Sequence, residues 1–300
     1  MGCNHNDLKI DLHIHSTASD GSLTSSEILT LAEKMGLGAI SITDHDAVDG
    51  NKELLQQKLR TTVNFLTGVE ISALPPSSFP TIGSFHILGY GINVEDNTLN
   101  QKLITLQNAR KNRNPKIISK LNALGIEISL NRVKEFCGDC QLGRPHIARY
   151  LVETGLVTSI NEAFDKYLGK GKAAYVEKFR IPCRQALQII TDAGGMSVLA
   201  HPYLLNLGKD AVFEKLISTL KSMGLQGIEV YYPEHPPEMV RFYTHIAHQY
   251  NLVITGGTDF HGDIKPEIQL GSGPGNFAVP FEIYENIINF LDQRLENLVR

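Results

Sequence analysis

Histidine and carboxylate side chains are concentrated near the N-terminus, in the run Asp11-Leu12-His13-Ile14-His15. The alternation of polar and apolar residues predicts a short β-strand with the acid and both imidazoles on one face. Two imidazoles on one strand face can bind one metal ion. The polar loop that follows returns a further carboxylate, Asp20, to the end of the strand. Three polar groups on one face of a core strand would need buried partners, so a metal site is predicted; the alternative is a surface strand with incidental histidines.

Further histidines and acids follow later apolar runs or lie within them. They are His45, Glu70, His86, His201, Asp259 and His261. Imidazole and carboxylate ligands suit manganese, zinc and iron, and mixed nitrogen and oxygen sites can hold more than one ion. One such histidine alone would more often be structural. The nine residues together therefore need a fold that brings them to one place.

The elements that position these residues follow from apolar periodicity. Besides the first strand, strands are predicted over 39–42, 62–71, 84–90, 196–200, 227–232 and 252–256. Helices are predicted over 24–35, opened by the capping box of Thr24 and Glu27, and over 50–60, 211–223, 237–249 and 281–298. Seven strands mostly separated by helices indicate an α/β fold, a parallel (β/α) barrel. Active-site residues of such barrels lie at the carboxyl ends of the strands.

Residues 95–190 interrupt this alternation and are predicted to be mostly helical. One helix is expected to start at Asn114-Pro115, a second at Gly143-Arg144-Pro145-His146, and a third over 161–168. We therefore divide the chain into a first barrel part (1–98), an inserted basic, helical substrate-binding subdomain (99–190) and a second barrel part (191–300). Residues 101–190 carry a net charge of +9, whereas the remainder carries −13. This segregation favours an anionic substrate.

Composition narrows the class of protein. The chain is 42% hydrophobic and 20% charged, as in globular proteins, and has no apolar run long enough to span a membrane. We expect a cytoplasmic protein with no membrane contact and no obligate protein partner. Its four cysteines do not form a disulfide framework, and Cys137 and Cys140 form a single CxxC that we interpret as a loop, not a zinc or redox site.

Five of the quoted runs together resemble one family. They are Asp-Leu-His-Ile-His (11–15), Thr-Asp-His (43–45), Gly-Val-Glu (68–70), Ala-His-Pro (200–202) and Thr-Asp-Phe-His (258–261). The set resembles the motifs of the PHP (polymerase and histidinol phosphatase) superfamily. Gly-Arg-Pro-His (143–146) and Ala-His-Pro-Tyr (200–203) are more narrowly similar to its phosphoesterases that act on nucleoside 3′,5′-bisphosphates and trim short RNA from the 5′ end.

The resemblance implies a distorted (β/α)7 barrel, the PHP fold, with three divalent metal ions. By that pattern His13, His15, Glu70 and Asp259 hold the first ion; Glu70, His86 and His201 the second; and Asp20, His45 and His261 the third. Mn2+ is expected first, with Zn2+ and Fe2+ as alternatives. Water activated by the ions would attack phosphorus directly. His201 and Asp20 are assigned catalytic roles, and the proton donor to the leaving oxygen is His201 or a metal-bound water.

The expected substrate is a nucleotide or a short oligonucleotide held by the basic insertion. Arg144 and His146, at a predicted helix start, are the first candidates for a second phosphate. Further candidates are Arg110, Arg113, Lys170, Lys172 and His235, each of which has a surface or turn role as its alternative. Tyr203 and Tyr232 either stack on a base or pack. Two other functions stay open: a histidinol-phosphate phosphatase or another small phosphomonoesterase, and a metal-binding module without catalysis.

Overall fold

The computed structural model describes residues 8–57, 61–79, 85–137 and 142–299. Its core is a sheet with the strand order β8-β7-β6-β4-β3-β2-β1-β9. The strands are β1 (Lys9–Ile14), β2 (Ala39–Ile42), β3 (Asn64–Leu74), β4 (His86–Tyr90), β5 (Ile181–Pro182), β6 (Met196–Leu199), β7 (Gly227–Tyr231), β8 (Val253–Gly256) and β9 (Val279–Pro280). Apart from the two-residue strands β5 and β9, these are the seven predicted strands. Residue 84 of the fourth predicted strand lies outside the described residues.

The sheet curls into a nearly closed barrel whose seam lies between β1 and β8. Ile14 forms a parallel bridge with Phe260, and the amide of His15 donates to the Phe260 carbonyl at 2.9 Å. The Asp11 carboxylate strengthens this seam by accepting from the Thr258 amide at 2.9 Å and from its hydroxyl at 2.5 Å. Gly257 allows the close approach, because a Cβ there would lie 2.3 Å from the backbone nitrogen of His13. The predicted α/β barrel is confirmed.

One strand departs from the parallel arrangement that we expected. β4 pairs antiparallel with β3 and with β6, placing Ser72 opposite His86. No helix between β3 and β4 is found in the described residues of this connection, and a short connection favours an antiparallel hairpin over a crossover. Because β4 runs in reverse, its first residue, His86, reaches the rim where the other strands end.

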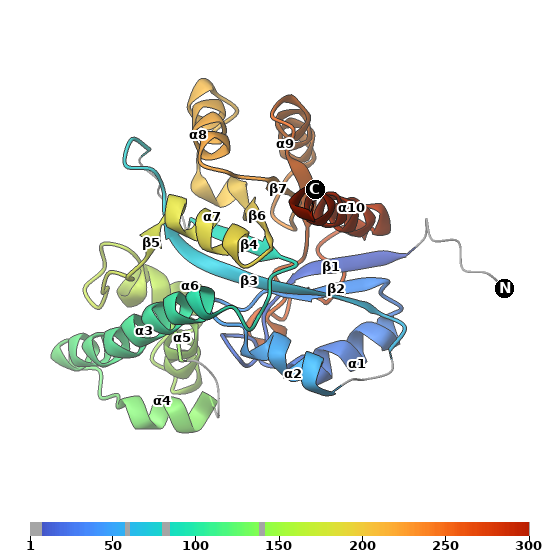
Figure 1. Ribbon diagram of the computed structural model, residues 1–300. Coiled ribbons are helices and arrows are strands. Elements are labelled where there is room, and N and C mark those ends of the chain that lie inside the picture. Colours follow the sequence, from blue (N-terminus) through green and yellow to red (C-terminus); the bar gives the residue numbers. More distant parts are fainter. Residues whose placement is uncertain (1–7, 58–60, 80–84, 138–141, 300) are drawn as a thin grey trace.

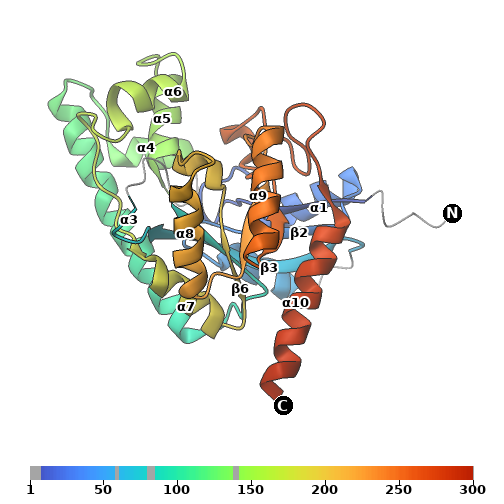
Figure 2. The ribbon, with the colours of Figure 1, turned by 90° about the horizontal axis from the view of Figure 1, so that it is seen from above.

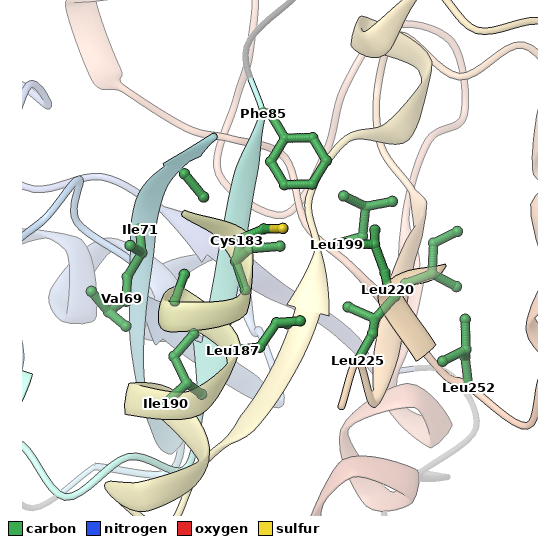
Figure 3. Packing of buried hydrophobic residues seen from close by; sticks show 14 of the residues in the cluster. Val69, Ile71, Phe85, Cys183, Leu187, Ile190, Leu199, Leu220, Leu225 and Leu252 are labelled. Carbon is green, nitrogen blue, oxygen red and sulfur yellow. The ribbon is translucent and has the colours of Figure 1, made fainter. Parts of the chain in front are cut away.

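Helices cover the outside of the barrel. They are α1 (Ser25–Met35), α2 (Asp49–Gln57), α7 (Cys183–Asp192), α8 (Ala211–Ser222), α9 (Pro237–Gln249) and α10 (Phe281–Val299). Residues 58–60, with which the second predicted helix ended, lie outside the described residues. The predicted capping box of α1 is present: Thr24 accepts from the Glu27 amide, and Glu27 from the Thr24 amide. In Figure 3, Cys183, Leu187 and Ile190 of α7 lie among Val69 and Ile71 of β3, and this contact forms part of the largest buried cluster.

The basic insertion lies to one side of the barrel, away from α10 (Figures 1 and 2). Its helices are α3 (Asn97–Ala123), α4 (Leu130–Cys137), α5 (Arg144–Glu153), α6 (Ile160–Ala163) and the π-helical turn η2 (Phe164–Leu168). Residues between Ile117 and Ala174 form a hydrophobic cluster of their own, whereas Leu99, Leu103 and Leu106 of α3 pack into the barrel cluster. The division at residues 98 and 190 stays a prediction.

One predicted helix start in the insertion is wrong. The helix does not begin at Asn114-Pro115, because α3 starts at Asn97, where the Asp96 side chain accepts from the Leu99 amide, and runs through Pro115. The buried leucines on both sides of the proline hold the helix together across the missing hydrogen bond. The helix start at Gly143 is confirmed. Cys140 lies outside the described residues, and within the described ranges no helix is long and apolar enough to cross a membrane.

Candidate metal centre and anion pocket

All nine predicted metal ligands converge at one end of the barrel. His13 and His15 come from β1, Asp20 from the loop after it, and His45 from the residues after β2. Glu70 lies in β3, and His86 starts the reversed β4. His201 follows β6, and Asp259 and His261 follow β8. All nine side chains are buried or nearly so. Asp46, His201 and Asp259 have positive φ angles (55°, 26° and 57°), a strained backbone of the kind found at functional sites.

Glu70 is the centre of this cluster, because its two oxygens face five imidazoles. Oε2 lies 2.7 Å from Nδ1 of His45, and Oε1 lies 2.6 Å from Nδ1 of His86 and 3.0 Å from Nε2 of His201. Nε2 of His13 and Nε2 of His15 lie 3.5 and 3.3 Å from Oε2. Burial raises the pKa of Glu70, but His45, His86 and His13 outweigh it and hold that pKa well below its usual range. The carboxylate is therefore ionised, which suits the bridging role that the family pattern implies.

The cluster contains three groups of side chains whose ligand atoms lie within 4.8 Å of one another. They are His13, His15 and Glu70; His45, Glu70 and His86; and His15, Asp20, His45 and His261. Asp259 adjoins the first group, with Oδ1 3.1 Å from Nε2 of His15. His201 adjoins the second, with Nε2 3.3 Å from Nδ1 of His86.

The donor atoms themselves fit metal ions. Five of them are buried without a hydrogen-bond partner among the described residues: Nε2 of His13, Nε2 of His15, Oδ1 of Asp20, Nδ1 of His45 and Oε2 of Glu70. His45 and Glu70 approach closely, yet these atoms are not aligned for hydrogen bonding. Buried polar atoms are rarely left unpaired. Imidazole and carboxylate donors pointing at shared points suit divalent transition metals.

Metal binding at this site should strengthen as the pH rises. Burial lowers the pKa of His15, but its contacts with Asp259 and Glu70 outweigh burial and raise that pKa to about 9. An incoming ion must displace this proton. We expect the apparent affinity for Mn2+ to increase between pH 7 and 9, by up to roughly tenfold per pH unit for each displaced proton. Chelator competition at pH 7, 8 and 9 measures this, and an affinity that stays flat or falls would contradict it.

One buried acid at the site was missed by sequence reasoning. Glu229 in β7 is fully buried; its Oε1 lies 2.9 Å from Nδ1 of His13, and its Oε2 accepts from the His201 amide at 2.7 Å. Such a carboxylate fixes the tautomer and the ring orientation of a ligating histidine. It directs Nε2 of His13 toward Glu70 and Asp259. The signal in the sequence was an acid inside the apolar strand Gly227-Ile228-Glu229-Val230-Tyr231.

We expect Glu229→Gln to weaken metal binding by roughly 10- to 100-fold, the usual cost of losing an outer-sphere partner. The amide keeps the shape of the side chain and removes the charge that holds the imidazole. Chelator competition with the purified variant measures the loss, and thermal unfolding of the metal-free proteins checks that both are folded. Unchanged affinity in a folded variant would show that Glu229 does not support His13.

Asp44 was also missed, although it lies within a quoted motif. It is fully buried, and its oxygens accept from the Ser16 amide (2.7 Å), the Ser16 hydroxyl (2.6 Å) and the Ser19 hydroxyl (2.5 Å). These bonds fix the loop that carries Asp20. Asp44 therefore positions a ligand of the cluster from a neighbouring strand end.

Three predicted arginines lie close enough to one another to interact, and Arg110 bonds to Asp46 next to the predicted ligand His45. Arg110 and Arg113 on α3 are each only 5% exposed, and Arg110 donates to Oδ2 of Asp46 at 3.1 Å. Nε of Arg110, and Nε and Nη1 of Arg113, are buried without a partner in the described residues. Burial, together with Arg144 and Arg110, lowers the pKa of Arg113 to about 10. We call Arg110, Arg113 and Arg144 the arginine pocket; its spare donors fit an anion.

A lysine that sequence reasoning missed adjoins the arginine pocket. Burial and the neighbouring Arg110 lower the pKa of Lys178 to about 7, although Asp46 attracts its charge. Lys178 also contributes to the lowered pKa of His86, after burial and against Glu70. Lys178 therefore lies close enough to interact with both the arginine pocket and the metal cluster.

The other predicted substrate contacts in the insertion differ in their surroundings: some bond within the insertion and others are exposed. Arg144 donates to the Leu168 carbonyl at 3.0 Å and stacks on Phe164. His146 is buried, and its Nδ1 accepts from the Gly143 amide at 3.0 Å. Lys170 and Lys172 are exposed in the loop after η2, and the structure records no ion pair for them in the described ranges. Their roles stay predictions.

His235 and the two tyrosines lie near the rim but differ in exposure. His235 is buried, with its ring 5.1 Å from Tyr243 and 5.2 Å from Tyr232, and Nδ1 bonds to the Val230 carbonyl at 2.8 Å. This arrangement has the character of packing, and a substrate contact of His235 stays a prediction. Tyr232 is buried and its hydroxyl donates to Asp259 at 3.0 Å, whereas Tyr203 is 40% exposed.

This fold and site define a metal-dependent hydrolase. Comparison with known proteins agrees. A PHP domain model matches residues 11–114. The chain is 34% identical to a 3′,5′-nucleoside bisphosphate phosphatase of Chromobacterium violaceum, over 84% of this chain and 87% of that protein. It is 32% identical to a 5′-3′ exoribonuclease of Haemophilus influenzae, over 84% and 90%. A solved structure from Bifidobacterium adolescentis, provisionally described as a metal-dependent phosphoesterase, superposes with a TM-score of 0.82 and 25% identity, covering 94% of this chain and 96% of the other.

The chain therefore belongs to the PHP domain family, and it is a metal-dependent phosphoesterase. The resemblance seen in the sequence is confirmed. A catalytically silent binding module has no support in the relatives, which are named as hydrolases of phosphate esters.

Proposed function

We propose that this protein removes the 3′-phosphate of nucleoside 3′,5′-bisphosphates and trims short RNA from the 5′ end. The observation that carries the proposal is the arginine pocket beside the metal cluster, with three buried guanidinium nitrogens that have no hydrogen-bond partner in the part of the chain that the structure describes. A substrate with a second phosphate would satisfy them. The names of the two relatives support the same substrate class.

In this proposal each group of residues has its own role. The nine ligands would hold divalent ions, three by the family pattern, with Mn2+ expected first. When bound, such ions polarise phosphoryl oxygens and activate water. Glu229 and Asp44 orient the ligands, and Arg110, Arg113 and Arg144 hold the phosphate that is not cleaved. Proton donation by His201 and a catalytic role for Asp20 are part of the proposal.

The test is a substrate comparison with manganese-loaded protein. Phosphate release from adenosine 3′,5′-bisphosphate should exceed release from histidinol phosphate by at least roughly tenfold, since the second phosphate adds a charged hydrogen bond worth about 1.5–3 kcal/mol. Preference for histidinol phosphate would instead support a small phosphomonoesterase. Metal analysis of protein purified without chelator accompanies the assay, and well under one equivalent of metal, together with no hydrolysis, would contradict a metal-dependent hydrolase.

A further inference from the structure

A cleft lies between the insertion and the barrel rim, and Phe164 links it to the arginine pocket. Its volume is about 860 Å3, within the range of small-molecule sites. The barrel side is formed by the residues after β7, including Tyr232 and Glu234, and by the residues after β8, including His261 and Ile264. The insertion side is formed by Pro145 and by Ile160, Asn161 and Phe164. Because His261 belongs to the metal cluster, the cleft opens directly beside it.

The chemistry of the cleft differs from that of the arginine pocket. Apolar and aromatic side chains form much of its lining. Glu234 and Glu267 add two exposed carboxylates. Its only lysine or arginine among the described lining residues, Lys265, is paired with Asp259 at 2.6 Å. Such a cleft disfavours a phosphate and favours a neutral, flat group such as a nucleobase, which stacks on apolar and aromatic surfaces.

The two sites occupy different arcs of the barrel rim. The arginine pocket lies over Asp46, which follows β2, whereas the cleft lies over the ends of β7 and β8. In the sheet order, β2 is separated from β7 by β3, β4 and β6 on one side, and from β8 by β1 across the seam. The metal cluster lies between them. A substrate whose first phosphate is held by Arg110 and Arg113 reaches the β7 and β8 side of the cleft by continuing beyond the phosphate at the cluster.

A bisphosphate and an RNA chain differ in whether the substrate continues beyond the attacked phosphate. In both, water adds to phosphorus and the bond between phosphorus and the 3′ oxygen breaks, so that the first nucleoside leaves with a 3′-hydroxyl. In a bisphosphate the attacked phosphate is the end of the molecule. In RNA the attacked phosphate stays on the shortened chain as its new 5′-phosphate, and that chain begins with the second nucleoside.

The geometry points to this cleft as the binding site for the second nucleoside of an RNA substrate, the one on the 3′ side of the cleaved phosphodiester. The inference rests on the proposed function and adds to it a site that bisphosphates do not use. Phe164 joins the two sites, since it lines the cleft while the guanidinium of Arg144 lies 5.6 Å from its ring centre. The arginine pocket and the cleft would thus hold successive nucleotides on either side of the cleaved bond.

Filling the cleft tests the inference. Asn161 is exposed at its edge, so Asn161→Trp narrows the cleft without disturbing a hydrophobic cluster. Asn131→Trp, at an exposed position of α4 in the same insertion, is the matched control. The substrates are adenosine 3′,5′-bisphosphate, the 5′-phosphorylated dinucleotide of adenosine, and the same dinucleotide without its second base. All are assayed with manganese-loaded protein.

For the wild type, kcat/KM on the full dinucleotide should exceed that on the abasic one by roughly tenfold or more, as expected for one stacked base. Asn161→Trp should abolish this preference while turnover of the bisphosphate stays within about twofold, and Asn131→Trp should change neither. A parallel loss on all substrates, no loss on any, or no preference for the second base would overturn the inference. If the wild type hydrolyses the bisphosphate but neither dinucleotide, the cleft inference fails and the phosphatase proposal stands; if it hydrolyses none, both fail.

Discussion

Glu70→Gln should lower turnover by at least about 1,000-fold, because metal ions supply several kcal/mol of transition-state stabilisation and each 1.36 kcal/mol is worth tenfold in rate. Glu70 faces five imidazoles with both oxygens, so its charge is shared by more than one group of ligands. The amide retains the size of the side chain but removes the negative charge that would bridge two ions. Elemental analysis should show fewer bound ions per chain than in the wild type.

Glu127→Gln is the matched control, because Glu127 is an exposed acid of the insertion. It should retain wild-type metal content and turnover. Circular dichroism of the Glu70 variant checks that the barrel is folded. A folded Glu70→Gln protein with full metal content and turnover within tenfold of wild type would contradict the central position of this carboxylate.

Arg113→Ala should reduce kcat/KM for adenosine 3′,5′-bisphosphate by roughly 10- to 150-fold, the cost of about 1.5–3 kcal/mol for a charged hydrogen bond. Two nitrogens of this buried guanidinium have no partner in the described residues, and its neighbours Arg144 and Arg110 repel it. The loss of a cation from this group should leave the unfolding temperature unchanged or raise it. If Arg113 served mainly to stabilise the fold, Arg113→Ala would instead lower the unfolding temperature.

Arg132→Ala provides the control, since Arg132 is exposed on α4 of the same insertion. A substrate with one phosphate, such as histidinol phosphate, should lose much less than the bisphosphate when Arg113 is replaced. Equal losses on both substrates would assign Arg113 to the metal cluster and not to a second phosphate.

Sequence reasoning found the nine residues that the structure brings together, because their chemistry is local. An imidazole or a carboxylate at the end of an apolar run is visible without any tertiary information, and the barrel rule brings such ends together. The direction of β4 was not visible in the same way. A strand has the same period in either direction, so His86 was correctly placed at the rim while the direction of its strand was predicted wrongly.

The residues that support the ligands were harder to find. Glu229 and Asp44 bond to His13 and to the loop before Asp20, partners that are 216 and at most 28 residues away. Such pairings depend on which strand ends become neighbours. The helix start predicted at Pro115 was wrong for a related reason. Proline favours a helix start locally, but packing on both sides of it keeps α3 continuous. Lys178 was not singled out in the sequence, and only its half-buried position beside Arg110 distinguishes it from other lysines.

Metal ions bound at the predicted site would stabilise the barrel across the seam between β1 and β8, in addition to their chemical role. His13 and His15 belong to one edge of that seam, and Asp259 and His261 to the other. An ion bound by residues from both edges would cross-link β1 to β8 and so hold the barrel closed. Chelation should therefore lower the thermal unfolding midpoint, since a ligand that binds only the folded chain stabilises it by mass action. Differential scanning fluorimetry with and without EDTA measures the shift. Identical midpoints would mean that bound metal does not stabilise the barrel.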